Sequence, residues 1–159
     1  MSSNRLTSLT SFGHLRNLER LDISSNQLDS VARKSSDLMG LTLSLLAELT
    51  CLVHLRELNV DNNQISSIDG LSQLDGLIKI SMKNNRLSSI DLSRTKWRRL
   101  ESLNLSHNQL VNVSSLDCLE SCISLNLGEL RPSPSSSVLT HAQTTTHYVT
   151  LAVRGECLV

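Results

Sequence analysis

Aromatic side chains are nearly missing from this chain, which has one Trp, one Tyr and one Phe among 159 residues. Because Trp, Tyr and Arg are the usual anchors of tight protein interfaces, we expect any partner to be held by hydrogen bonds and charge, or at modest affinity. Charge of one sign does not prevail either, since 15 basic residues balance 15 acidic ones. A net charge of zero gives no general attraction to nucleic acid or to an anionic membrane.

The sequence also lacks membrane spans, leader features and catalytic motifs. The apolar run Leu38–Ala47 is much shorter than the roughly 20 residues that a spanning helix needs, and no charged-then-apolar leader predicts secretion. Cys118 and Cys122 have no second cysteine pair with which to complete a zinc site. There is no glycine-rich phosphate loop, and none of the five histidines lies in a nucleophile or metal motif. We therefore expect a cytoplasmic protein that is not an enzyme and holds no metal or cofactor.

What the chain does have is a motif of five aliphatic positions and one asparagine, repeated four times with offsets of 3, 2, 3, 2 and 3 residues. The copies are Leu18-Leu21-Ile23-Asn26-Leu28-Val31, Leu55-Leu58-Val60-Asn63-Ile65-Ile68, Leu77-Ile80-Met82-Asn85-Leu87-Ile90 and Leu100-Leu103-Leu105-Asn108-Leu110-Val113. These offsets do not follow the 3.5 or 3.6 periodicity of heptads or helices. The alternative of a helical bundle is therefore excluded.

Alternation of aliphatic and polar residues in the middle of each copy predicts a short strand with its aliphatic side chains turned inward. One such strand is not stable alone, but stacked copies form a parallel sheet over a continuous aliphatic core. The asparagine falls where the chain turns after the strand, and its amide can both donate to and accept from the backbone there. We expect strands centred on residues 21–23, 58–60, 80–82, 103–105 and 125–127.

This motif resembles that of the leucine-rich repeat family, L-x-x-L-x-L-x-x-N-x-L, in its 22-residue class. The resemblance implies an α/β solenoid, with a curved parallel β-sheet on the concave face and irregular or 3-10 segments on the convex face. It also implies that the asparagines form a structural ladder through the repeats, made of Asn26, Asn63, Asn85 and Asn108. Phe12 and Trp97 take aliphatic positions of the frame, so both are expected in the core.

The repeat domain is expected to cover residues 1–130, with two irregularities. Asn4-Leu6-Leu9 matches the second half of a repeat, so the first repeat is truncated. Asn26 and Asn63 are 37 residues apart, which leaves an excess of 15 residues at about Arg33–Ala47. Two interpretations remain open for this excess. It is either a loop or short helix grafted on the convex side, or an intron translated in frame.

Residues 131–159 no longer follow the repeat. Ser and Thr are frequent there and Pro132 and Pro134 interrupt the start, a composition typical of a disordered tail. Alternation at Val149, Leu151 and Val153 leaves an edge strand as the alternative. A tail foreign to the repeat is also consistent with a mispredicted transcript end.

The predicted fold allows the exposed positions of the concave face to be named, and we expect them to bind a polar peptide of mixed charge. They are Arg20, Asp22, Ser24, Glu57, Asn59, Asp61, Lys79, Ser81, Lys83, Ser102, Asn104 and Ser106. A competing interpretation is that the acidic residues of the second strand pair with the lysines of the third and merely solvate the sheet. The basic cluster Arg94–Arg99 is either a solvated turn or a contact for an acidic partner.

The stretch LRELNVDNNQISSIDGL, from Leu55 to Leu71, is similar to the repeats of the fungal septation-initiation and mitotic-exit scaffold of the spindle pole body. The resemblance implies a non-catalytic scaffold or adaptor that binds other proteins at that location, although the long region outside that family's repeats has no counterpart here. The alternative is a regulatory subunit of a protein phosphatase or of another intracellular enzyme. An aromatic-rich concave face would favour the phosphatase regulator, and it is missing here.

Overall fold

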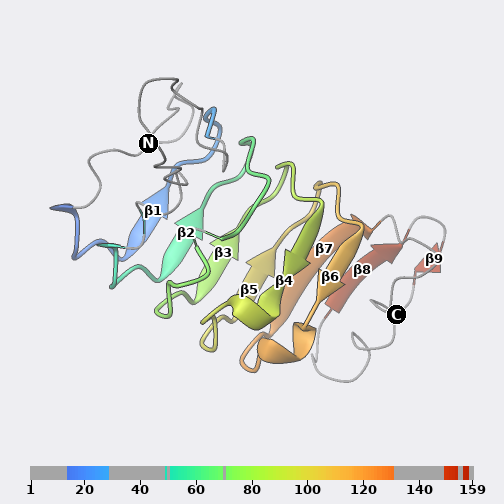
Figure 1. Ribbon diagram of the computed structural model, residues 1–159. Coiled ribbons are helices and arrows are strands. Elements are labelled where there is room, and N and C mark those ends of the chain that lie inside the picture. The colour runs from blue at the N-terminus through green and yellow to red at the C-terminus, as the bar shows by residue number, and fades with distance from the viewer. Residues whose placement is uncertain are drawn as a thin grey trace, which may run out of the picture.

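Parallel strands dominate the computed structural model, which describes residues 14–28, 49, 51–69, 71–130, 149–153 and 156–157. The main sheet has the order β1-β2-β3-β5-β7-β8-β9, and β4 and β6 pair separately (Figure 1). The main-sheet strands are β1 Arg20–Asp22, β2 Glu57–Asn59, β3 Lys79–Ser81, β5 Ser102–Asn104, β7 Ser124–Leu130, β8 Val149–Val153 and β9 Glu156–Cys157. No helix in these ranges is long and apolar enough to cross a bilayer.

The first five of these strands pair in parallel through the repeat frame. Leu21 lies opposite Leu58, and the same register continues through Ile80, Leu103 and Leu125. The predicted curved solenoid is therefore confirmed. Each strand begins one residue earlier than the sequence predicts. In β2, β3, β5 and β7 the amide of this first residue already donates a hydrogen bond to the previous turn.

The core is a column of aliphatic side chains stacked from one repeat to the next. Ile23, Val60, Met82, Leu105 and Leu127, which share one frame position, are each at most 1% exposed. Trp97 is also confirmed as a core residue at 1% exposure, and its indole Nε1 donates a hydrogen bond of 3.0 Å to the Leu71 carbonyl. Phe12 lies outside the described residues.

The asparagine ladder is confirmed by hydrogen bonds that join successive turns. Asn85 shows the pattern: its Oδ1 accepts from the Ile65 amide of the preceding repeat, and its Nδ2 donates to the carbonyls of Val60, Met82 and Lys83. Asn63 and Asn108 make the equivalent bonds one turn to either side. Asn26 donates to the Ile23 and Ser24 carbonyls. Each amide thus satisfies backbone groups that the buried turn would otherwise leave unpaired.

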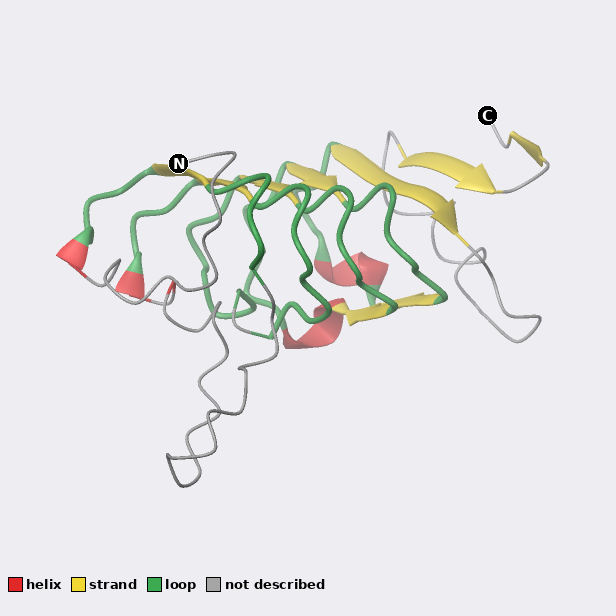
Figure 2. Ribbon diagram, turned by 90° about the horizontal axis from the view of Figure 1, so that it is seen from above, coloured by secondary structure: helices red, strands yellow, loops and turns green. Residues whose placement is uncertain are grey.

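The opposite face contains irregular segments and the 3-10 turns η3, Leu92–Arg94, and η4, Leu116–Cys118, as the family resemblance implies (Figure 2). It also carries a small parallel sheet of β4, Ser89–Asp91, and β6, Asn112–Ser114, which the sequence did not predict. Ile90 and Val113 hold the same frame position in successive turns and lie opposite each other in this sheet. The turns therefore stack closely enough for their extended backbones to pair on this side too.

The two irregular regions of the sequence have different outcomes. β1 pairs directly with β2, and Asn63 Oδ1 accepts from the Leu28 amide, so the repeats on either side of the excess are neighbours. The excess, Arg33–Ala47, and the partial match to a repeat at Asn4 lie outside the described residues. In the region expected to be a tail, the alternative of an edge strand at Val149, Leu151 and Val153 is present as β8, which pairs in parallel with β7 and antiparallel with β9. The alternation of Val149, Leu151 and Val153 indicated this strand, but the sequence did not show that β7 would be its partner.

Candidate functional site

The register of the main sheet arranges the concave polar residues in three rows. A first row precedes the central buried residue of each strand, a second follows it, and a third lies just beyond the strand end. The first row is Arg20, Glu57, Lys79, Ser102 and Ser124; the second is Asp22, Asn59, Ser81, Asn104 and Asn126; the third is Ser24, Asp61, Lys83 and Ser106. Since adjacent strands lie about 4.8 Å apart, each row is a line of neighbouring side chains.

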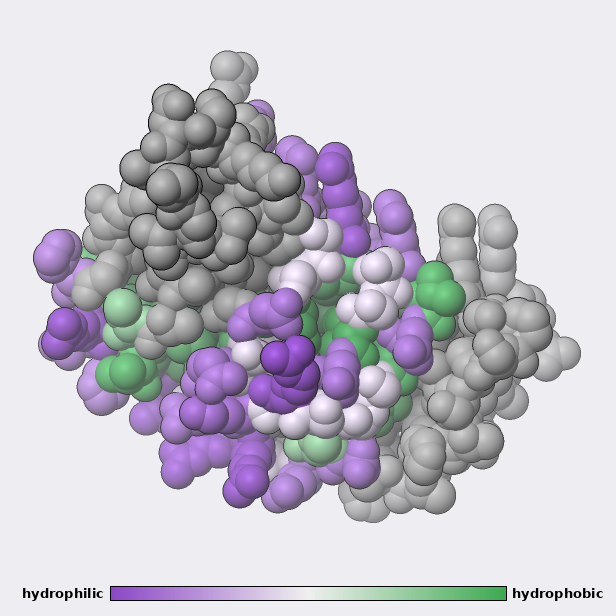
Figure 3. All heavy atoms as spheres, viewed as in Figure 1, coloured by the Kyte–Doolittle hydropathy of each residue, from purple (hydrophilic) through white to green (hydrophobic). Residues whose placement is uncertain are grey.

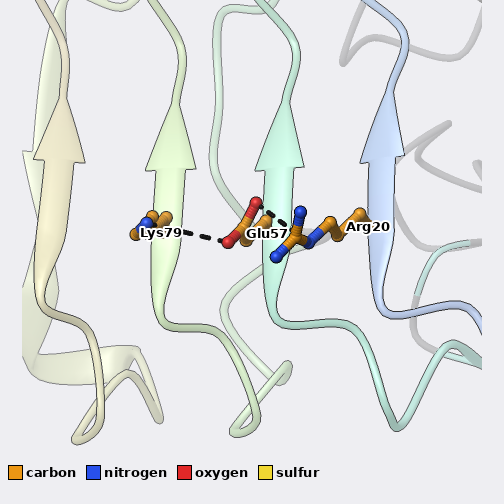
Figure 4. Close-up of polar contacts among 3 residues, drawn as sticks. All are labelled: Arg20, Glu57 and Lys79. Atoms are coloured by element: carbon orange, nitrogen blue, oxygen red, sulfur yellow. Dashed lines mark ion pairs between the residues drawn. The ribbon is translucent and has the colours of Figure 1, made fainter.

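Charges of alternating sign open the first row. Glu57 lies between Arg20 and Lys79, with its carboxylate 3.4 Å from Arg20 Nε and 3.7 Å from Lys79 Nζ (Figure 4). The Arg20 and Lys79 side chains remain 78% and 58% exposed, so solvent screens these pairs and their net stabilisation is small. The expected pairing of Glu57 with a lysine is present, but Arg20 shares it. One negative charge therefore faces two positive ones.

In four of the five strands the second-row side chain accepts a hydrogen bond from a backbone amide two residues further along the chain. Asn59 Oδ1 accepts from the Asp61 amide, Asn104 Oδ1 from the Ser106 amide, and Asn126 Oδ1 from the Gly128 amide. Asp22 makes the same turn, accepting from both the amide and the hydroxyl of Ser24. These bonds hold the pKa of the Asp22 carboxyl below its ordinary value, chiefly through the Ser24 amide. An Asx turn thus closes four of the five strands.

The third strand lacks this acceptor because Ser81 occupies the second-row position. The neighbouring Asp61 replaces it: its Oδ1 accepts from the Lys83 amide and from the Ser81 hydroxyl, each at 2.7 Å. Asp61 is therefore bound to the backbone of the next turn and is not paired with the Lys83 ammonium. The predicted pairing across the sheet holds for Glu57 and does not extend to Asp61.

One predicted site residue is not on the surface. Ser106 is 7% exposed, and its hydroxyl donates to Asn104 Oδ1 at 2.8 Å. Gly128 explains the burial, since a Cβ built on this glycine would lie 2.8 Å from Ser106 Cα. The fifth strand therefore covers Ser106. The same strand adds Ser124 and Asn126, which sequence reasoning omitted because the fifth repeat lacks the asparagine of the others; the aliphatics Leu125 and Leu127 were the signal.

Eight of the twelve predicted residues line one shallow hollow of about 530 Å³ on the concave face. They are Arg20, Asp22, Glu57, Asn59, Lys79, Ser81, Ser102 and Asn104. Ser24, Asp61, Lys83 and Ser106 lie outside it. The described residues that line the hollow include no aromatic side chain.

The described residues do not form the cluster of side chains that a metal site requires. No three His, Cys, Asp or Glu side chains among them lie close enough to hold a metal ion. Cys118 and Cys122 are unpaired thiols in this part of the chain, and burial raises the pKa of both. Burial thus disfavours the thiolate, which is the form of cysteine that binds metals.

Comparisons with known proteins agree with this architecture. Models of the family described as Leucine Rich repeats (2 copies) match residues 53–94, and two models described as Leucine Rich Repeat match residues 14–34 and 99–122. Together the matched segments cover more than half of the chain.

Relatives and solved structures add to this result. A probable inactive serine/threonine-protein kinase of Dictyostelium discoideum is 33% identical over 119 residues; the match covers 74% of this chain and 5% of that protein. Internalin C2 of Listeria monocytogenes matches 96% of the chain and 69% of its own, with a TM-score of 0.59 and 24% identity. A leucine-rich repeat protein of Leptospira interrogans matches 93% of the chain and 36% of its own, with a TM-score of 0.72 and 22% identity. The two structural likenesses show the fold alone, and the chain belongs to the leucine-rich repeat family.

Proposed function

We propose that this protein is a non-catalytic interaction module that holds a polar segment of a partner protein on its concave face. The observation that carries the proposal is the hollow of about 530 Å³ over β1, β2, β3 and β5, which is lined by charged and amide side chains. Solenoids of stacked repeats present such concave surfaces for binding. The surface is held by a sheet whose turns are fixed by side-chain hydrogen bonds, so little order has to be gained on binding.

The hydrogen bonding of the rows points to the chemistry of the partner. The Oδ1 atoms of Asn59 and Asn104 are already occupied by strand-end amides. The Lys79 side chain is 58% exposed and shares the single carboxylate of Glu57 with Arg20, so its ammonium can still donate to a partner. Together with the Ser102 hydroxyl, it gives the part of the hollow over β3 and β5 hydrogen-bond donors. A partner segment with a carboxylate or exposed carbonyls fits this side, with the carboxylate next to Lys79.

Charge reversal on the concave face tests the proposal. Lys79→Glu should abolish capture of the partner in an affinity experiment, while Arg86→Glu, an equal change of charge at an exposed position outside the hollow, should leave capture intact. Asp61 is unsuited to the test because its carboxylate holds the Lys83 amide and the Ser81 hydroxyl. Equal capture by the Lys79 variant, with unchanged circular dichroism in both, would mean that the partner binds elsewhere.

For the cellular setting we propose a scaffold role in septation or mitotic-exit signalling at the spindle pole body. The stretch from Leu55 to Leu71 and the run Leu74-Asp-Gly-Leu77 support this setting through their resemblance to the repeats of that scaffold. Mass spectrometry of proteins that are captured by the wild type and lost with Lys79→Glu tests it. Spindle-pole components are the expected result, and a phosphatase catalytic subunit in their place would establish the regulatory-subunit alternative.

A further inference from the structure

A second hollow, of about 350 Å³, lies at the rim where the strands of the main sheet begin. Its lining includes Arg56 from the turn before β2 and Lys96, Arg98 and Arg99 from the turn before β5. Figure 3 shows hydrophilic residues gathered along this rim, which is the lower edge in the view of Figure 1. The site is separate from the concave face, since none of these four cations lines the concave hollow.

Gly76 forms the gap in this rim. The repeat spacing places it between His54 of the preceding turn and Arg99 of the following one, and all three line the hollow. A Cβ at Gly76 would come within 3.2 Å of the Leu55 carbonyl oxygen. The missing side chain thus lets Gly76 pack closely on the backbone of the preceding turn, and it leaves a gap in the row of longer polar side chains formed by His54 and Arg99.

The cations around the gap lack opposite charges. None of Arg56, Lys96, Arg98 and Arg99 forms an ion pair with a described residue, whereas the exposed cations Arg20 and Lys79 on the concave face share Glu57. One carboxylate, that of Asp75, also lines the hollow, so positive charge remains in excess. Four like charges around a small volume repel one another, and an anion with several acceptor oxygens would relieve the repulsion.

We propose that this hollow binds the phosphate of a phosphorylated serine or threonine in a partner protein. A phosphomonoester carries up to two negative charges and three strong acceptor oxygens, and the planar fork of an arginine guanidinium matches them in pairs. One compact dianion fits this confined cluster better than a single carboxylate does. Val53, which is 60% exposed at the edge of the hollow, offers an apolar contact to a residue beside the phosphate.

Nucleic acid fits the site less well. Single strands are held by aromatic platforms along a basic groove, and the described residues that line this hollow include no Phe, Tyr or Trp. The hollow takes residues from only three successive turns of the solenoid, and the chain as a whole has no net positive charge.

The test is an NMR titration of the full chain with a short phosphoserine peptide of otherwise neutral residues. The unphosphorylated peptide and a single-stranded oligonucleotide serve as parallel probes. We expect the phosphopeptide to shift the amide signals of Gly76 and Arg99 in a saturable way, and the unphosphorylated peptide to shift neither. Arg98→Gln/Arg99→Gln should weaken binding of the phosphopeptide by about tenfold or more, since the loss of one charge-assisted contact already corresponds to about tenfold.

The matched control is Arg86→Gln/Arg94→Gln, which removes the same charge from exposed positions outside the hollow and should bind like the wild type. Spectra that agree away from the substituted residues show that both variants are folded. Equal binding of the unphosphorylated peptide, shifts confined to the concave face, tighter binding of the oligonucleotide, or equal weakening by the control would each overturn the proposal. Because the readout is local to Gly76, the result does not depend on whether the concave face binds a partner.

Discussion

Single residues at the strand ends fix the backbone conformation of the turns in this solenoid. Ser25, Asn62, Asn84 and His107, which each precede a ladder asparagine, have left-handed backbones with φ between 54° and 57°. Asn84 Nδ2 donates to Asn62 Oδ1, so a second, exposed chain of contacts runs beside the buried ladder. Asparagine tolerates this conformation better than most residues. Many polar side chains of these turns therefore form hydrogen bonds within the solenoid, and only some of them are left to bind a partner.

Replacing Asn85 with Ala should lower the free energy of unfolding by about 1–3 kcal/mol, the cost of leaving buried polar groups without a partner. The side chain is 6% exposed, and it bonds one amide and three carbonyls. Urea unfolding followed by circular dichroism measures the change. As a control, Asn84→Gly keeps the left-handed backbone at an exposed position and should change the free energy by no more than about 0.5 kcal/mol. Equal effects of the two would contradict the ladder.

Asp22 should make stability depend on pH in the acid range. Its hydrogen bonds from Ser24 lower the pKa in the folded state below the ordinary value of 3.8, so the folded state favours the ionised form. The resulting stabilisation is present above the unfolded pKa and is lost as pH falls through the folded pKa. Asp22→Asn keeps an acceptor oxygen for the turn without the charge. Its urea midpoint should therefore fall less than that of the wild type between pH 6 and pH 3, and an identical fall would contradict the assignment.

At the scale of elements, the strands of the first five turns were predictable because each copy of the motif carries its own alternation. The small sheet of β4 and β6 was not predictable in this way. Ser89–Asp91 and Asn112–Ser114 each contain one aliphatic residue, and neither has a strand pattern of its own. They become strands only because two turns, 23 residues apart, bring extended backbones together. Pairing decided by a distant segment is not visible in a local pattern.

For the candidate sites, too, part of the arrangement could be predicted from the sequence and part could not. The concave rows follow from register alone, which is why eight predicted residues do line one hollow. The burial of Ser106 depends on the close approach of Gly128, a contact that no spacing rule contains. The basic cluster was predicted as one surface, but Arg94 belongs to η3 while Lys96, Arg98 and Arg99 surround the gap at Gly76. Which cations share a hollow depends on the turn geometry and on a glycine from the neighbouring repeat.

At the scale of the whole molecule, the repeats form one continuous stack although the sequence is interrupted. Leu21 and Leu58 are 37 residues apart and lie opposite each other, while every later pair in this register is separated by 22 or 23 residues. Asn63 reinforces this junction, since it donates to the Ile23 carbonyl and accepts from the Leu28 amide. The contacts across the junction therefore match those between uninterrupted repeats.

Deleting Arg33–Ala47 should consequently leave a protein at least as stable as the full chain. The deletion restores the 22-residue spacing between Asn26 and Asn63, and a shorter connection lowers the entropy cost of closing the turn, by roughly 0.6 kcal/mol for each halving of its length. Thermal unfolding followed by circular dichroism gives the comparison, with an equal or higher midpoint expected. A control deletion of residues 55–69 removes β2 and one ladder asparagine, and it should abolish cooperative unfolding. If removal of Arg33–Ala47 alone abolishes cooperative unfolding, that segment is an integral part of the solenoid and the continuity of the stack depends on it.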